Sequence, residues 1–315
     1  MIQLLAYRPV ANIAARLGLA PSPSEMVKKN KRFAVMGDAG SGDTHQYAVA
    51  RRMWRTYCRN PFSHVVVLGD NVYEDGEPKF FEERIKKPYR RLWKAGVEFD
   101  PVLGNHDVRG GFADEQLRFW NVPRWYSFKM GDSDSNNAVE FFAIDTTLML
   151  PLCDNAHIND LPAALRMEKA QRQWLETALT NSTARYKVVY GHYPMYSSGS
   201  HSYLDAKNNN LMRTRLEPLL THYGVDLYMA GHEHLYERSA PIGGVRHIVS
   251  GAGSKLGAVM VSQPDHPRVT AQSRYHFMLF EITPCGLLFK AIDRKGHVMD
   301  KGLIPPKAAR TLAFA

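Results

Sequence analysis

The sequence predicts an α/β fold for most of the chain. Short apolar runs alternate with segments whose apolar residues recur every three or four positions, a pattern typical of strands alternating with amphipathic helices. Several of these runs end in glycine followed by a polar residue, as expected where the strands of a sheet lead into ligand-binding turns. No run approaches the ~18 uninterrupted apolar residues of a transmembrane helix. We therefore expect no membrane span.

The expected elements fall into three groups. The clearest strands are 32–36, 64–68, 187–190 and 225–229, which are short and rich in apolar residues. Further strand-like runs without intervening helices are 138–144, 246–249, 275–282 and 287–292. Apolar spacing of three and four predicts helices at 46–59, 77–95, 168–179 and 211–223.

The length fits one large domain or two small ones, and we expect a single domain at residues 31–305. The chain has 315 residues, of which 44% are hydrophobic and 23% charged, as is ordinary for a globular protein. Residues 1–30 start without acidic residues and pass into a Pro-Ser linker, so we expect a flexible tail or a targeting segment there. Residues 306–315 are expected to form a C-terminal tail. The three cysteines cannot build a disulfide framework.

The formal net charge of +9 favours anionic partners. The basic residues are dispersed along the chain, and the only short clusters are 28–32 and 84–91. Both clusters are too small for a nucleic-acid groove, and aromatic and basic residues do not interleave as they do in stacking platforms. We expect no nucleic-acid partner.

Five predicted turns carry side chains of the kind that bind metals. They are Gly37-Asp38, Gly69-Asp70, Gly191-His192, Gly231-His232 and, after the shorter run 101–103, Gly104-Asn105-His106-Asp107. Any one of them has a structural explanation, because Gly-Asp after a strand is often a turn or a helix cap. Five such turns in one domain instead indicate a shared site, since ligands bind at the carboxyl ends of strands in α/β sheets.

The residue types at these turns favour a pair of metal ions. Carboxylate and amide oxygens with imidazole nitrogens suit iron, zinc and manganese, and no cysteine accompanies them. His232 and His234 alternate, so in an extended turn their rings can approach two neighbouring ions. Asp70 can bridge two ions, and ions ~3.5–4 Å apart hold both the attacking and the leaving oxygen of a displacement.

The order of these motifs resembles the calcineurin-like metallophosphoesterases. The motifs are Asp38, Gly69-Asp70-Asn71-Val72-Tyr73, Gly104-Asn105-His106-Asp107, Gly191-His192 and Gly231-His232-Glu233-His234. Tyr73, three residues after Asp70, resembles the purple acid phosphatases. Three further stretches resemble the small tartrate-resistant type: Gly37-Asp38-Ala39-Gly40, Gly191-His192-Tyr193-Pro194 with His201 nine residues after His192, and Ser250-Gly251-Ala252-Gly253. The resemblance spans about residues 31–300 and implies a four-layer α-β-β-α sandwich of two mixed sheets.

The resemblance also implies a role for each motif residue. Asp38, Tyr73 and His234 would hold a first metal, which is Fe(III) in that family. Asn105, His192 and His232 would hold a second metal, which is Fe, Zn or Mn, and Asp70 would bridge the two. His106 and His201 match the histidines that face the substrate, with Asn105 beside them. Asp107 is a candidate for orienting His106.

The implied activity is that of an acid phosphatase on phosphate monoesters. Tyrosine has an ordinary pKa near 10, so a strongly Lewis-acidic ferric ion is needed to keep Tyr73 as phenolate. In the family a metal-activated hydroxide attacks phosphorus in line. His201 would protonate the leaving alkoxide, and His106 would stabilise charge on the phosphoryl oxygens. The expected substrates are small phosphoesters or phosphoproteins, and we expect a monomer.

The sequence departs from the tartrate-resistant pattern around His201. Cys153 has no cysteine partner in the stretch after His201, and Ser200 replaces the acidic residue that commonly precedes this histidine. These changes leave the compartment open between secretory, lysosome-like, organellar and cytoplasmic. Residues 148–164, which include Cys153 and His157, are expected to form a loop at the rim of the site rather than another metal site.

Two alternative functions stay open at this point, and the sequence argues against a third. A phosphodiesterase or nucleotide pyrophosphohydrolase would keep the fold and change the substrate. An iron-dependent redox protein would use the same metal pair, and its activity would survive the loss of His201. A binding protein with a decayed site conflicts with the intact set of seven ligand-type residues.

Overall fold

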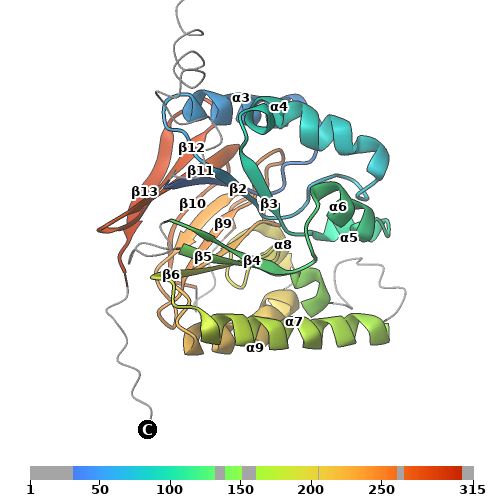
Figure 1. Cartoon of the computed structure of the whole chain (residues 1–315), viewed down its shortest axis with the longest axis vertical. Coiled ribbons are helices and arrows are strands. Elements are labelled where there is room, and N and C mark those ends of the chain that lie inside the picture. Colours follow the sequence, from blue (N-terminus) through green and yellow to red (C-terminus); the bar gives the residue numbers. More distant parts are fainter. Residues whose placement is uncertain (1–30, 132–138, 151–160, 205, 261–265, 307–315) are drawn as a thin grey trace, which may run out of the picture.

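The computed structural model describes residues 31–131, 139–150, 161–204, 206–260 and 266–306 (Figure 1). The expected N-terminal segment 1–30 lies outside these residues, as does the expected C-terminal tail except for residue 306. Most of the expected rim loop, including Cys153 and His157, also lies outside them.

The described strands form two mixed sheets. The first, sheet A, has six strands in the order β13-β12-β11-β1-β2-β3, and the second, sheet B, has seven in the order β10-β8-β9-β7-β6-β5-β4. Sheet A contains β1 (Arg32–Met36), β2 (His64–Val67), β3 (Glu98–Pro101), β11 (His276–Thr283), β12 (Gly286–Asp293) and β13 (Val298–Ile304). Sheet B contains β4 (Tyr126–Met130), β5 (Val139–Ala143), β6 (Tyr186–Tyr190), β7 (Leu227–Ala230), β8 (Tyr236–Ser239), β9 (Arg246–Ser250) and β10 (Arg268–Gln272).

Helices cover the outer faces of the two sheets (Figure 1). On sheet A lie α3 (Thr44–Tyr57) and α4 (Lys87–Lys94), and on sheet B lie α7 (Leu161–Asn181) and α9 (Ala206–His222). Shorter helices follow individual strands: α5 (Asn105–Arg109), α6 (Ala113–Trp120) and α8 (Ser200–Leu204). The two central sheets between two helical layers confirm the four-layer α-β-β-α sandwich that the resemblance implied.

Apolar side chains fill all three spaces between these layers. Phe33, Val188 and Phe280 are among those that pack between the two sheets. Val49 and Met53 of α3 pack against the outer face of sheet A, and Leu175, Leu179 and Leu216 of α7 and α9 pack against sheet B. The central parallel strands are buried on both faces, and for this reason they read as continuous apolar runs in the sequence.

The eight strand predictions correspond to β1, β2, β5, β6, β7, β9, β11 and β12, with ends shifted by one or two residues. Strands β4, β8, β10 and β13 were not predicted. The burial of β13 alternates and much of β10 is exposed, so neither presents a continuous apolar run. Strand β3 has only four residues and ends in proline, which explains why the sequence indicated only a short approach at 101–103.

One predicted helix is wrong as a single element. Residues 77–95 form a 3₁₀ turn (Pro78–Phe80), a π-helical turn (Glu82–Lys86) and then α4. Pro88 has no backbone N–H, so the helix cannot keep its regular hydrogen-bond pattern where the proline enters, and the π-turn lies just before it. The prediction at 46–59 is confirmed as α3, whose first N–H groups are capped by the Asp43 carboxylate.

None of the helices in the described ranges combines the length and apolarity needed to cross a bilayer.

Two buried histidines make stability depend on pH. His247 and His276 are 4% and 1% exposed, and burial lowers their pKa values to about 3 and about 4. In the unfolded chain a histidine pKa is about 6.5. As pH falls below 6.5, the unfolded chain binds protons that the folded chain does not, so the stabilisation present above pH 6.5 is lost toward the folded pKa values.

We therefore predict that unfolding free energy, measured by urea titration, falls by about 2 kcal/mol per histidine between pH 7 and pH 5. His247→Phe removes one of the two histidines and should therefore remove about half of this pH dependence. The substitution breaks no hydrogen bond, because neither ring nitrogen of His247 has a hydrogen-bond partner among the described residues. His222→Phe, at an exposed position, is the matched control and should keep the wild-type slope. If the unfolding free energy of His247→Phe depended on pH as strongly as that of the wild type, buried His247 would not be a source of the pH dependence.

Candidate active site

The five predicted ligand turns meet at the carboxyl ends of neighbouring strands from both sheets. In sheet A, Asp38 follows β1, Asp70 and Tyr73 follow β2, and Asn105 follows β3. These three strands are adjacent and parallel. In sheet B, His192 follows β6 and the turn 232–234 follows β7, the adjacent parallel strand. The two sheets thus deliver their turns to one place between them.

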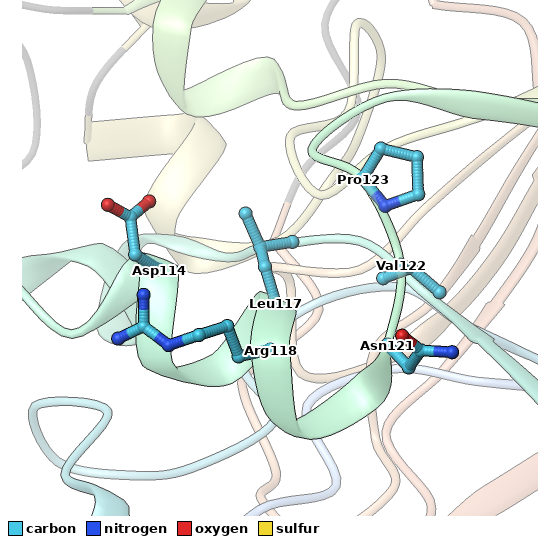
Figure 2. A pocket seen from close by; sticks show the side chains of 6 residues that line it. All are labelled: Asp114, Leu117, Arg118, Asn121, Val122 and Pro123. Carbon is cyan, nitrogen blue, oxygen red and sulfur yellow. The ribbon is translucent and has the colours of Figure 1, made fainter.

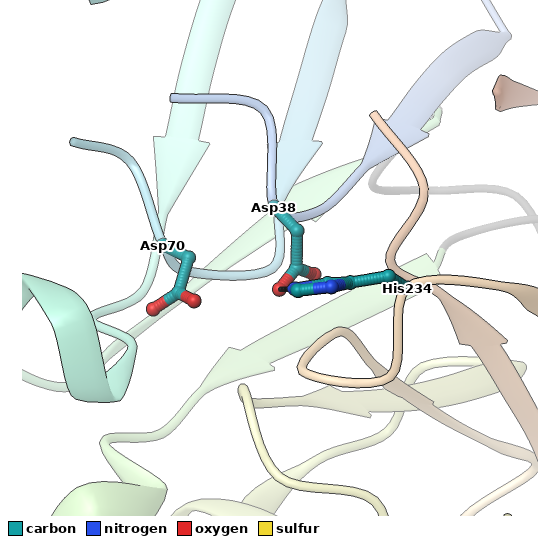
Figure 3. Close-up of side chains that lie close together, drawn as sticks. All are labelled: Asp38, Asp70 and His234. Carbon is teal, nitrogen blue, oxygen red and sulfur yellow. Dashed lines mark ion pairs between the residues drawn. The ribbon is translucent and has the colours of Figure 1, made fainter. Parts of the chain in front are cut away.

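Asp38, Tyr73 and His234 form the first group of ligand atoms. The Tyr73 hydroxyl lies 3.1 Å from Asp38 Oδ1 and 3.2 Å from His234 Nε2, and Asp38 Oδ1 lies 3.5 Å from His234 Nε2. Figure 3 shows Asp38 and His234 directed toward each other with Asp70 beside them. Ligand atoms of Asp38, Asp70 and His234 all lie within 4.8 Å of one another, which suits one metal ion.

Asn105, His192 and His232 form the second group. Asn105 Oδ1 lies 2.9 Å from His192 Nε2 and 3.2 Å from His232 Nδ1. The Nδ1 of His192 donates to the Leu68 carbonyl at 2.8 Å, so in the neutral ring the lone pair is on Nε2, which faces the group. Metal-binding histidines are commonly oriented by such a backbone bond from the other ring nitrogen.

Asp70 lies between the two groups. Its Oδ1 is 3.4 Å from His192 Nε2, and the residue also belongs to the cluster with Asp38 and His234. The backbone N–H of His106 donates to Asp70 Oδ1 at 3.0 Å and fixes the carboxylate. Asp70 thus has oxygen atoms close to both groups.

The backbone of the site is strained where ligand-type residues are placed. Asp38, Asp70 and His232 have φ of 54°, 52° and 66°, in the left-handed region that side chains other than glycine rarely adopt. Close approach also excludes side chains nearby, since a Cβ on Gly104 would lie 2.2 Å from Asp70 Oδ1. Such strain persists only where surrounding structure holds it, and it is concentrated at functional sites.

Without a cation, the charges in this site oppose one another. Burial raises the pKa of Asp38 well above its ordinary value, and burial together with Asp38 and Asp70 does the same to the pKa of Tyr73. Burial and the neighbouring His192 lower the pKa of His232 well below its usual range. A bound cation reverses this balance, because it favours deprotonated carboxylates, phenolate and neutral imidazole.

The Asp107 carboxylate links two turns of the site by hydrogen bonds and forms none with the His106 ring in the described structure. Its carboxylate accepts from the backbone N–H of Asn71 and Val72 in the turn after β2, at 2.9 and 3.1 Å. It also accepts from Gly104 N–H at 2.8 Å and from the Gln116 side chain at 2.8 Å. In the described part of the chain, no hydrogen bond or ion pair joins this carboxylate to the His106 ring, whose Nδ1 donates to the Glu74 carbonyl at 2.5 Å.

His106 and His201 both lie beside the ligand cluster, next to different members of it. The ring of His106 lies 4.5 Å from the ring of Tyr73. The ring of His201, exposed on the short helix α8, lies 4.9 Å from that of His232 and 5.5 Å from that of His234. Both rings can therefore reach a molecule bound at the cluster.

Sequence reasoning missed Glu233 and Lys255. The buried Glu233 carboxylate accepts from the backbone N–H groups of His201 and Ser202 and thereby holds the first turn of α8. Lys255 places its ammonium 3.6 Å over the Tyr73 ring and 3.3 Å from Glu74. The signal for Glu233 was its place between two ligand histidines, whereas Lys255 carried no motif of its own beyond following the 250–253 stretch.

The surface also has a hollow away from this cluster. It lies along α6 and the segment after it and has a volume of about 420 Å³ (Figure 2). It is lined by Asp114, Leu117, Arg118, Asn121, Val122 and Pro123. None of these residues is an expected ligand or catalytic residue, so the hollow is not the candidate active site.

Residues 31–236 match the family model described as calcineurin-like phosphoesterase. The match covers strands β1 to β7 and the turn that carries His232 and His234. The chain belongs to this family. It is therefore a metallophosphoesterase, which is a hydrolase of phosphoesters, and the resemblance first read from the five turns is confirmed.

Curated relatives narrow the likeness to purple acid phosphatases. Purple acid phosphatase 17 of Arabidopsis thaliana is 32% identical over 71% of this chain and 68% of its own length. Tartrate-resistant acid phosphatase type 5 of Oryctolagus cuniculus is 25% identical over 88% of this chain and 91% of its own length. These relatives are named as acid phosphatases, which agrees with the predicted enzyme class.

A solved structure shares the fold. It is titled "GAP50 the anchor in the inner membrane complex of Plasmodium", and it superposes with a TM-score of 0.75 at 22% identity over 89% of this chain and 90% of its own. At this identity the likeness concerns the fold alone.

We predict that Asp107→Asn destabilises the protein by about 2–3 kcal/mol, because the amide cannot accept all the N–H groups that the carboxylate now joins. The measurement is urea unfolding at pH 7. Asp114→Asn, an exposed acid on α6, is the matched control and should stay within about 0.5 kcal/mol of wild type. Equal stability of the two variants would rule out the tie between the turns.

Proposed function

We propose that this metallophosphoesterase is an acid phosphatase that hydrolyses phosphate monoesters at a dinuclear centre of Fe(III) and a second metal (Fe, Zn or Mn). The observation that carries the proposal is the approach of the Tyr73 hydroxyl to Asp38 and His234 within 3.2 Å. Tyr73 is only 1% exposed, and its hydroxyl lies among atoms that could bind a metal, which supports a role for Tyr73 as a ligand.

The residues present fit two metal ions. When His192 is neutral, the bond from its Nδ1 to Leu68 leaves a lone pair on Nε2, which faces the oxygens of Asn105 and Asp70 at 2.9 and 3.4 Å. Lone pairs at these distances repel one another unless a proton or a cation lies between them. One ion would be held by Asp38, Tyr73 and His234, the other by Asn105, His192 and His232, and Asp70 would serve both.

When bound, the metal pair would supply Lewis acidity that activates water and offsets phosphoryl charge. The chain's own residues would orient the substrate. His106 Nε2 is available because Nδ1 donates to the Glu74 carbonyl, so this atom can donate to a phosphoryl oxygen when protonated. Asn105 would position the phosphoryl group from the strand-end turn beside it.

His201 would protonate the leaving oxygen. Its ring is exposed next to the His232 and His234 rings, on the solvent side where a leaving alcohol would depart. Glu233 would keep it there by holding the N-terminus of α8, which compensates for the missing acidic residue at position 200. General acid catalysis of this kind contributes typically 10²–10⁴-fold.

The first test is the visible absorption spectrum of the purified protein beside Tyr73→Phe, with metal content measured on both samples. We expect a purple tyrosinate charge-transfer band in the wild type that disappears in the variant, with about two metals per wild-type chain. A colourless wild type that still binds two metals would reduce Tyr73 to a packing role. It would indicate a divalent-metal phosphoesterase working nearer neutral pH.

His201→Asn should slow hydrolysis in a way that depends on the leaving group. An alkyl phosphate, whose leaving oxygen needs a proton, should lose about 10²–10³-fold in kcat, while p-nitrophenyl phosphate should lose at least tenfold less. Metal content should stay at the wild-type level.

Two results would contradict the proposal in different ways. An equal loss on both monoesters would remove His201 as the proton donor. Faster wild-type turnover of bis-p-nitrophenyl phosphate than of the monoesters would instead identify a phosphodiesterase. The spectrum of the same samples separates this outcome from loss of the metal pair.

A further inference from the structure

A groove crosses the outer face of sheet A, on the side of α3 that faces away from α4. It has a volume of about 550 Å³. One wall comes from α3 and the residues just after it, including Arg52, Thr56 and Arg59, and the floor comes from strands β11, β12 and β13. In Figure 1, α3 and α4 lie over sheet A, and β13 at the edge of the sheet extends beyond α3.

The floor is formed by matched pairs of residues across the edge hairpin. Strand β13 is the edge of the sheet, and its outward residues lie directly opposite outward residues of β12. Leu288 lies opposite Leu303, with exposures of 44% and 42%. Val298, opposite Ile292 toward the other end of the same face, is 50% exposed. Leu287 and Ile304, on the other face of the same strands, are buried in the core between the sheets.

Directly beside the leucine pair, Lys290 lies opposite Lys301. Like charges directly opposite in an antiparallel pair destabilise the sheet. Neither ammonium forms an ion pair with any residue in the described ranges. The protein thus keeps a destabilising lysine pair beside an exposed leucine pair on one sheet face.

The charge of the whole groove has one sign. Its lining includes five cations, Arg32, Arg52, Arg59, Lys290 and Lys301, against one carboxylate, Glu281, which gives a net charge of +4. Glu281 is already paired with Arg32 at 2.6 Å. An apolar floor with cationic flanks fits a ligand that has an apolar stripe and acidic flanks.

We propose that this groove is a docking site for an amphipathic, acidic helix of a partner protein. On this face β13 extends beyond α3, so a helix lying in the groove beside α3 would continue the helical layer. The leucine pair would receive its apolar stripe, and Lys290, Lys301 and Arg59 would pair with its carboxylates. This inference does not depend on the metal centre.

Charge argues against the chain's own ends as occupants. The chain leaves the described residues close to the groove, at Lys31 before β1 and after Ile304 at the end of β13. Residues 1–30 contain four basic residues and one acidic residue, and residues 307–315 contain two basic residues and none acidic. Both segments have the same sign as the groove. A flat anionic bilayer also fits poorly, because the floor is recessed beside α3.

The test uses the full chain and a designed fluorescent peptide of about five helical turns, with leucines at helical spacing and glutamates on both flanks. Fluorescence anisotropy should show saturable binding to wild type. Lys290→Glu/Lys301→Glu and, separately, Leu288→Ser/Leu303→Ser should each weaken binding at least tenfold. A peptide of the same composition with the helical spacing scrambled should bind at least tenfold more weakly.

Controls keep the result independent of folding and of catalysis. Phosphatase turnover and the urea midpoint of each variant should match wild type, and Arg59→Glu, on the wall rather than the sheet, should weaken binding without touching the hairpin. Equal binding by the scrambled peptide, or no effect of the substitutions, would overturn the proposal. So would binding to phosphatidylserine vesicles without binding of the peptide, or a wild-type dimer that Lys301→Glu converts to monomer.

Discussion

The burial of Asp38 and Asp70 side by side is the constraint on which the site depends. Both are 1% exposed or less, and two neighbouring carboxylates cannot both be ionised there without compensation. Backbone N–H groups of His232 and His106 supply part of it, at 3.0 Å each. The left-handed turns, the nearby glycines and the surrounding histidines hold the pair in place, and the proposed metal ions would complete the compensation.

This constraint also explains why the two sheets must be held in a fixed position relative to each other. Asp38 and Asp70 come from sheet A, while His192 and His232 come from sheet B, so the cluster exists only when the strand ends of both sheets meet. The apolar layer between the sheets fixes that meeting, with Phe33 stacked on Phe280 at 4.7 Å and packed edge-on against Phe141 at 4.9 Å. Packing in the centre of the molecule thereby sets distances at its edge.

The sequence predicted the parts of the fold that are buried on both faces and the polar turns that meet at their ends. It did so because continuous apolar runs and Gly-Asp or Gly-His turns leave a local signal. It could not predict β13, whose exposed Leu303 and Lys301 read as a loop, or the break in 77–95, where Pro88 interrupts an apolar pattern. The tie through Asp107 and the hold of Glu233 on α8 depend on contacts between distant turns, which no local pattern records.

The candidate site and the proposed docking groove involve different parts of sheet A. Arg32, which lines the outer groove, begins β1, and Asp38 follows its end after Met36. None of the expected ligand residues lines the groove, so a helix in the groove would leave the ligand turns uncovered. Because β1 is held between β2 and β11 along its length, a partner bound in the groove would fix where the phosphatase works without altering how it works. Recruitment of substrate by proximity, rather than control of the metal centre, is the consequence of this arrangement.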